Sequence, residues 1–182
     1  MSIQSKITPE AFAPLVVTQQ HLESAINSAC DRLIVNDRQL FARNVNERSF
    51  SHKFAMYLQD EVEKWTEEWD VDCEFNRDAQ DTGEDYAKRL DLIDKIESLT
   101  TSVFDEHART VFPDVIVHQR GPGNNLLVVE VKKGIADPIS IEFDRRHKLP
   151  AYVKQLGYQA AAFLLLRMDD RDCQVEWIRK LG

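Results

Sequence analysis

The residues best suited to chemistry are two carboxylates and a lysine: Asp114, Glu130 and Lys132. Asp114 stands before one apolar run, and Glu130 and Lys132 stand at the end of the next. Two β-branched runs separated by a loop rich in Gly, Pro and Asn are typical of a β-hairpin. If this hairpin folds about Pro122, Asp114 lies directly opposite Glu130, and two like charges in such positions repel each other. Lys132 lies two residues beyond Glu130 and therefore on the same face.

A divalent cation would explain why an otherwise apolar hairpin carries two opposed carboxylates. Mg²⁺ prefers carboxylate and water oxygens, and it binds through one or two carboxylates together with substrate phosphate. The cation makes an acceptable pair of two groups that otherwise repel each other. A lysine beside it can orient or deprotonate a water and offset the charge that develops on a phosphate. The spacing therefore predicts metal-assisted hydrolysis of a phosphodiester.

Pro113-Asp114, followed after fifteen residues by Glu130-Val131-Lys132, resembles the signature of the PD-(D/E)xK nuclease superfamily. Its members include restriction endonucleases, Holliday-junction resolvases and helicase-associated exonucleases, and the pattern is also similar to that of small bacterial proteins. The resemblance implies an α/β fold with a restriction-endonuclease-like core, a central mixed β-sheet flanked by helices. It implies that Asp114 and Glu130 hold Mg²⁺, for which Mn²⁺ can substitute, and that Lys132 assists the attacking water. The implied partner is nucleic acid, DNA in preference to RNA, and a homodimer is left open.

In this superfamily an acidic residue from a helix before the sheet often completes the metal site. Glu47 fits this role, because it lies in the first turn of a predicted helix over 47–66, at the buried edge of the apolar stripe. Its alternative role is to stabilise the helix N-terminus, and Glu61 is the reserve ligand. Gln155, with Tyr158, resembles the glutamine–tyrosine motif of the exonuclease-like branch, at a spacing of three where that motif has four. The side chains expected to contact nucleic acid are Gln155, Lys133, Arg120, His118 and Lys148.

Hydrophobic periodicity predicts the elements that position these residues. Apolar residues at helical spacing predict helices from Thr18 to about 34, at 39–43, over 47–66, at 90–99 and from near Leu149, with Pro150 in the first turn of the last. Alternating or continuous apolar runs predict strands at 69–76, in the second half of 160–166 and at 173–178, besides the hairpin and a short extended piece at 139–143. The remaining stretches read as an extended lead-in at 1–17 and an excursion between strands at 77–110.

Composition is that of an ordinary globular chain, and we expect a single nuclease-like domain over 1–182, with 1–44 as an N-terminal helical extension. No apolar run has the length of a membrane span, and the N-terminus lacks a signal pattern. Three cysteines form neither a disulfide framework nor a zinc motif, which favours a reducing cytoplasm. The net charge of −8 disfavours nucleic-acid binding unless basic side chains cluster around the acidic site.

Three functions compete for this sequence, and a Mg²⁺-dependent nuclease, endonuclease or exonuclease, is the leading hypothesis. The second is a non-catalytic module on the same fold that binds nucleic acid or protein. The acidic net charge favours that module, whereas the intact Asp–Glu–Lys set argues against it. A nucleotide-binding enzyme is disfavoured, because Gly121-Pro122-Gly123 lies within a hairpin and not between a strand and a helix. An ordinary amphipathic strand with a solvated Glu130 is also disfavoured, since residues 126–129 form an unbroken apolar run.

Overall fold

The computed structural model describes residues 16–65, 68–74, 112–120 and 124–182, together with the backbone of four two-residue strands. These strands form two small antiparallel pairs, β2 (Asp78–Ala79) with β3 (Asp85–Tyr86) and β4 (Arg89–Leu90) with β5 (Arg109–Thr110). Leu90 thus lies in a strand and not at the start of a helix. The rest of the helix expected at 90–99, residues 1–15 of the lead-in and Gly121-Pro122-Gly123 lie outside the described residues.

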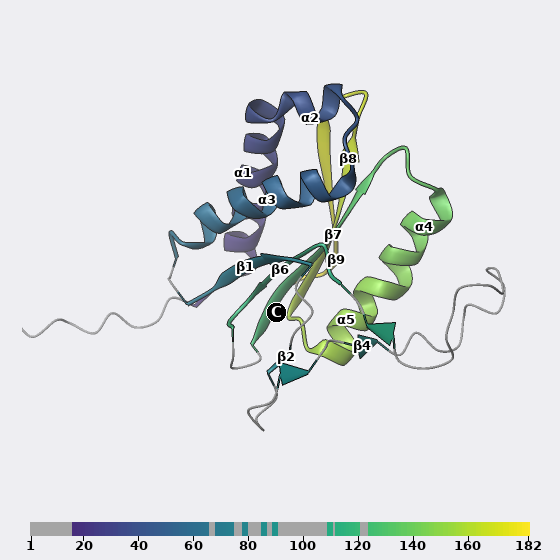
Figure 1. Ribbon diagram of the computed structural model, residues 1–182. Helices are drawn as coiled ribbons and strands as arrows, with labels where there is room; N and C mark the ends of the chain where they lie inside the picture. The colour runs from purple at the N-terminus through teal and green to yellow at the C-terminus, as the bar shows by residue number, and fades with distance from the viewer. Residues whose placement is uncertain are drawn as a thin grey trace, which may run out of the picture.

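A five-stranded mixed sheet forms the centre of the fold, in the order β1-β6-β7-β8-β9 (Figure 1). Its strands are β1 (Asp70–Cys73), β6 (Val115–His118), β7 (Asn125–Lys133), β8 (Ala160–Arg167) and β9 (Asp172–Arg179). Only the central β7–β8 pair is parallel, and the other three pairs are antiparallel. The predicted α/β class, with a mixed sheet flanked by helices, is therefore confirmed.

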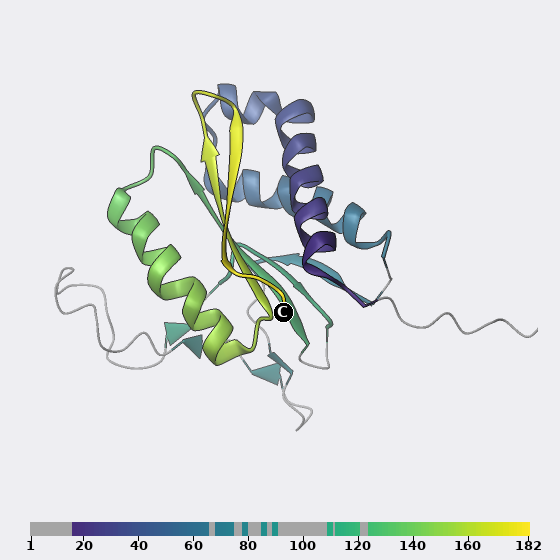
Figure 2. The ribbon, with the colours of Figure 1, turned by 180° about the vertical axis from the view of Figure 1, so that it is seen from behind.

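Helices lie on both faces of the sheet, as the two opposite views show (Figures 1 and 2). One face carries α1 (Gln19–Asn36), α2 (Arg38–Ala42) and α3 (Glu47–Val62). The other carries a single continuous helix made of α4 (Pro138–Phe143), a π-helical turn η1 (Asp144–Lys148) and α5 (Leu149–Leu156). Each layer buries its own apolar cluster against the sheet, and α1, expected as an extension, contributes six buried residues to the larger cluster.

The hairpin has the predicted register at the end that carries the carboxylates. The paired residues are Val115 with Val129, Ile116 with Val128, and Val117 with Leu127, and the register shifts by one residue beyond them. One step before the first pair, Asp114 comes opposite Glu130. Asp114 Oδ2 also accepts a hydrogen bond from the backbone N–H of Val131 at 2.8 Å, which fixes this carboxylate against β7.

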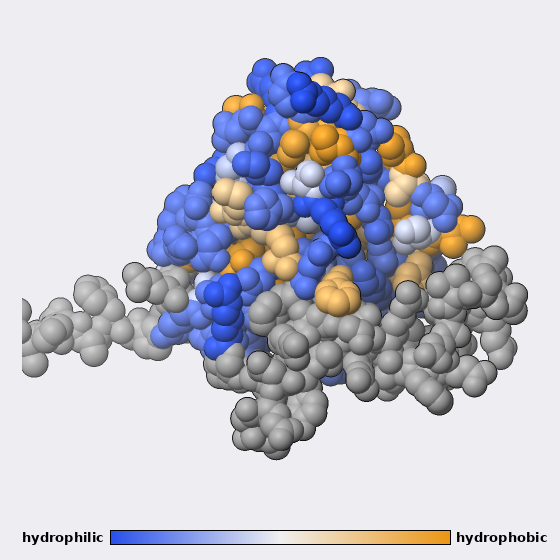
Figure 3. Space-filling view, in the orientation of Figure 1, coloured by the Kyte–Doolittle hydropathy of each residue, from blue (hydrophilic) through white to orange (hydrophobic). Residues whose placement is uncertain are grey.

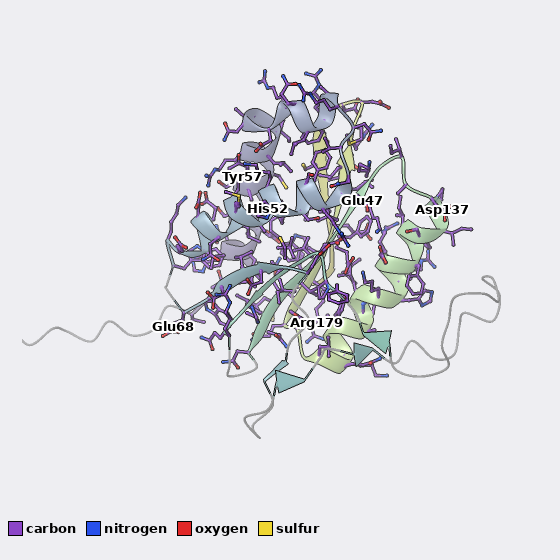
Figure 4. The ribbon with its side chains drawn as sticks, viewed as in Figure 1. Glu47, His52, Tyr57, Glu68, Asp137 and Arg179 are labelled. Atoms are coloured by element: carbon purple, nitrogen blue, oxygen red, sulfur yellow. The ribbon has the colours of Figure 1, made fainter. Side chains whose placement is uncertain are left out.

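Two predictions for the segment after the hairpin are wrong. Residues 139–143 are helical and not extended, because the side chain of Asp137 (Figure 4) caps the helix by accepting two backbone N–H groups of its first turn, and Pro138 follows as the first helical residue. The helix therefore does not begin near Leu149. Pro150 lies inside it, two residues after the last residue of the π-helical turn. Proline removes a helical hydrogen bond and crowds the carbonyl four residues earlier, and the wider turn accommodates this.

The last two strands follow the predicted pattern, with one difference in length. All of 160–166 is strand, whereas only its second half was predicted, and β9 spans the predicted edge strand at 173–178. Gly157 allows the strand to begin at Ala160, because its left-handed backbone (φ 70°) ends α5 and turns the chain toward β8.

Most of the outer surface of the described residues is polar. On the face shown in Figure 3, hydrophilic side chains surround separate groups of apolar ones. The large apolar side chains that are exposed come from several elements and loops: Val16, Val35, Met56, Phe112, Ile135 and Ile139. Within the described part of the chain, no helix has both the length and the apolar character needed to cross a membrane.

Gly157→Ala should destabilise the fold by about 1 kcal/mol, because an alanine there keeps an unfavourable left-handed backbone although its Cβ would meet no atom within 4 Å. Gly134→Ala is the matched control, since its backbone is not left-handed and its new Cβ would make an ordinary contact at 3.4 Å. Urea unfolding of both variants measures the difference. Equal stability of the two would show that the turn into β8 does not require a left-handed residue.

Candidate active site

Glu130 lies at the centre of the candidate site, with a side chain that is 0% exposed. It sits on the face of β7 that the α4–α5 helix covers. Its Oε2 accepts a hydrogen bond from Lys148 Nζ at 2.8 Å, whereas Oε1 has no hydrogen-bond partner among the described residues. Burial and the neighbouring charge of Asp114 raise the pKa of Glu130 well above its usual value, and Lys148 opposes that rise only in part. An unpartnered buried carboxylate oxygen of this kind is costly without a ligand.

Asp114 faces Glu130 from the start of β6. Burial raises the pKa of Asp114, although the Val131 N–H and the ammonium groups of Lys148 and Lys132 act in the opposite direction. Two carboxylates held opposite each other on neighbouring strands repel. The pair therefore places two acidic groups side by side, one half-buried and one fully buried.

Lys132 is held between two carboxylates that come from opposite layers of the fold. Its Nζ lies 3.5 Å from Glu47 Oε2, at the N-terminal end of α3, and 3.3 Å from Asp144 Oδ2, in η1. Burial lowers the pKa of Lys132, but Asp144 and Glu47 outweigh burial, and the pKa is raised. The lysine is thus an ammonium fixed two residues from Glu130.

Glu47 is the first residue of α3 and lies where that end of the helix meets β7 (Figure 4). Besides the ion pair with Lys132, its Oε1 accepts the backbone N–H of Lys133 at 3.2 Å, and its side chain is 31% exposed. The structure therefore brings the predicted third acid to the site, in contact with the lysine. The reserve residue Glu61 is elsewhere, because its carboxylate contacts Ser28 on α1 and Lys64.

Sequence reasoning missed the contribution of the α4–α5 helix. Asp144, Lys148 and Tyr152 follow one another at intervals of four residues, so that one face of the helix presents all three to the sheet. The sequence pattern assigns Asp144 and Tyr152 no role in the site, and it predicts Lys148 only as a nucleic-acid contact. The four-residue interval was the available signal. It was hidden because the helix was expected to begin only near Leu149.

Tyr152 closes the buried side of the site. Its ring centroid lies 5.8 Å from Lys148 Nζ, and its hydroxyl is buried. Burial and the charge of Glu130 raise the pKa of Tyr152, although the hydroxyl forms no hydrogen bond of ordinary geometry with the described residues. Tyr152 therefore acts mainly as an apolar wall that shields Glu130.

Two predicted nucleic-acid contacts, His118 and Arg120, lie at the other end of β6. Arg120 donates two hydrogen bonds to Asp72, at 2.9 and 2.5 Å, and His118 Nε2 lies 2.9 Å from the same carboxylate. Burial acts to raise the pKa of Asp72, but Arg120 and His118 outweigh it and the pKa is lowered. His118 is buried and four residues from Asp114, roughly 13 Å along an extended strand. The structure does not bring these residues to the carboxylate pair.

The remaining predicted contacts are divided between the two faces. Lys133 points away from Glu130, with Nζ bonded to Asn44 Oδ1 at 3.1 Å and to the carbonyl of Val45 at 3.0 Å. Gln155 is exposed on α5. Of the five residues expected to touch nucleic acid, only Lys148 lies within the carboxylate cluster.

The donor atoms at the site suit a hard cation held by two protein groups. No group of three or more His, Cys, Asp or Glu side chains among the described residues is arranged to hold a metal ion. Mg²⁺ does not require one, because it commonly binds through one or two carboxylates, with water and substrate phosphate completing its shell. Asp114 and Glu130 provide two carboxylates, and the unpartnered Oε1 of Glu130 is a free ligand atom. The residues present therefore fit a two-carboxylate magnesium site.

Asp114→Asn should stabilise the protein in EDTA by about 1 kcal/mol, because it removes one of two opposed charges. Its amide oxygen can still accept the Val131 N–H. Asp72→Asn is the matched control and should destabilise, since it weakens bonds to Arg120 and His118. Urea unfolding distinguishes the two. A destabilised Asp114→Asn would show that repulsion between these two carboxylates is outweighed by the contacts that the aspartate makes.

Comparison of the chain with protein-family models, curated proteins and solved structures found no match.

Proposed function

We propose that the protein is a Mg²⁺-dependent nuclease that hydrolyses nucleic-acid phosphodiester bonds. The observation that carries this proposal is the carboxylate pair, half-buried Asp114 opposite fully buried Glu130, with the Lys132 ammonium two residues further along β7. The resemblance to the PD-(D/E)xK signature adds support from the residue types and their order.

Bound Mg²⁺ would supply Lewis-acid activation of a phosphate oxygen and of a water. Asp114 and Glu130 would hold it, and Mn²⁺, which has similar ligand preferences, can take the same place. The carboxylates are fixed by the hairpin register and by the Val131 N–H, so they need little rearrangement to bind a cation. Tyr152 and the sheet exclude water from their buried side.

Lys132 stabilises charge that develops during the reaction. Its ammonium is held by Glu47 from one layer and Asp144 from the other, which fixes its position relative to Glu130. A preorganised cation of this kind orients a water and offsets negative charge on the phosphate oxygens. Glu47 and Asp144 therefore act as positioning residues for the lysine.

Glu130→Gln should abolish cleavage. The assay incubates the protein with Mg²⁺ or Mn²⁺ and a panel of single-stranded, duplex and branched DNA and RNA. We expect the wild type to cut at least one substrate and Glu130→Gln to lose about 100-fold or more of the rate. Glu61→Gln, which changes a glutamate remote from the site, should retain the wild-type rate. Equal activity of Glu130→Gln and wild type would refute the proposed site, and absence of cleavage by the wild type would favour the non-catalytic binding module.

Lys132→Met should lower turnover by about 10²–10³-fold while barely changing the Mg²⁺ concentration that gives half activity, because the ammonium acts in the transition state and is not a ligand. Lys133→Met removes an ammonium that contacts the loop before α3, and this variant should keep most of the wild-type turnover. Recovery of the Lys132→Met rate at high Mg²⁺ would mean that the lysine shapes the metal site instead.

Lys148→Met should distinguish the two positive charges that can balance Glu130, the Lys148 ammonium and a bound cation. In EDTA the variant should be less stable by about 3 kcal/mol, because it leaves a buried carboxylate without its partner. Added Mg²⁺ should then raise its melting temperature more than that of the wild type, since the cation replaces the lost positive charge. Lys154→Met, which changes an exposed lysine on the same helix, should match the wild type in stability and in its response to Mg²⁺. A Mg²⁺ effect that disappears in Lys148→Met would make this lysine part of the binding site.

A further inference from the structure

A hollow of about 470 Å³ lies one strand from Glu130, between the α4–α5 helix and the β8–β9 hairpin. Its floor is apolar, formed by Phe163 and Leu165 of β8 and by Ile141 of α4. Polar side chains stand at its edge: Arg145, Gln174 and Glu176.

Strand register fixes where the hollow lies relative to the site. On the face of the sheet under the helix, Glu130 pairs with Phe163, which in turn pairs with Glu176. One step further, Lys132 pairs with Leu165, which pairs with Gln174. Neighbouring strands are about 4.8 Å apart, so the floor of the hollow is one strand from the reacting groups and its far edge about 10 Å away.

The charges in the hollow are balanced, which argues against a second phosphate as its ligand. Arg145 forms ion pairs with Glu176 and, at 3.5 Å, with Glu142. Its guanidinium lies 6.0 Å from the Phe163 ring centroid, and its Nε–H is buried without a hydrogen-bond partner among the described residues. An apolar floor with the Arg145 guanidinium, the Glu176 carboxylate and the Gln174 amide at its edge suits a flat, uncharged heteroaromatic ring with polar edges.

We infer that this hollow binds the nucleobase adjacent to the scissile phosphate. The inference rests on the proposed function and specifies its substrate. Unpaired bases are recognised by stacking on aromatic and guanidinium planes and by hydrogen bonds to their exposed edges. A base stacked within a duplex cannot enter such a hollow. The preferred substrate is therefore single-stranded, or unpaired at the point of cleavage.

Direct binding tests this without relying on catalysis. Fluorescence anisotropy in EDTA measures the affinity of the wild type for a short single-stranded DNA, and for copies in which one nucleotide at a time is abasic. Gln174→Ala and Leu165→Trp, which remove an edge group and fill the floor, are compared with Gln39→Ala, an exposed amide on α2. Melting temperatures confirm that each variant is folded. Cleavage of the same DNAs in Mg²⁺ is measured in parallel.

We expect one abasic position to weaken wild-type binding by about tenfold. Both hollow variants should bind the intact strand more weakly than the wild type does. They should bind that abasic copy as the wild type does, because each altered side chain acts only on the base that the copy lacks. Equal losses for the intact and abasic strands, or no loss in either variant, would overturn the hollow as a base site while the nuclease proposal stands. Tighter binding and faster cutting of a fully paired duplex would also overturn it. A wild type that neither binds nor cuts any strand would overturn both proposals.

Discussion

The repulsion between Asp114 and Glu130 is the constraint on which the rest of this site depends. A hairpin register that would be unremarkable for two apolar residues places two carboxylates opposite each other, one of them fully buried. Such an arrangement lowers stability unless positive charge is supplied. The surrounding residues supply that positive charge and keep water away from the buried carboxylate.

The positive charge comes from two directions. Lys148 reaches Glu130 from the helix that covers one face of the sheet, while Lys132 extends from β7 itself. Glu47 and Asp144 then hold Lys132 from both layers. The π-helical turn spans Asp144 to Lys148, so the segment with unusual backbone geometry is also the one that contributes both residues. Such turns occur frequently at functional sites.

Much of this arrangement could be predicted from the sequence, because it depends on short-range patterns. Alternation and turn residues located the hairpin, and its symmetric folding placed Asp114 opposite Glu130. The helical stripe after Glu47 brought that residue to the sheet. The contribution of Asp144 could not be predicted in this way. It depends on the helix continuing through Pro150, against the local preference of proline, and the sequence pattern does not reveal the π-helical turn that accommodates this residue. The pairing of His118 and Arg120 with Asp72 likewise depends on contact between β1 and β6, which the sequence pattern does not display.

Direct observation of cation binding is the most decisive test of this account. Titration of the protein with Mn²⁺, followed by electron paramagnetic resonance of the free ion, counts bound ions without any substrate. The wild type should bind Mn²⁺ at a site from which competing Mg²⁺ displaces it. This site should be lost in Asp114→Asn but retained in Asp72→Asn. Unchanged Mn²⁺ binding by Asp114→Asn, or no binding by the wild type, would show that the carboxylate pair is not a metal site.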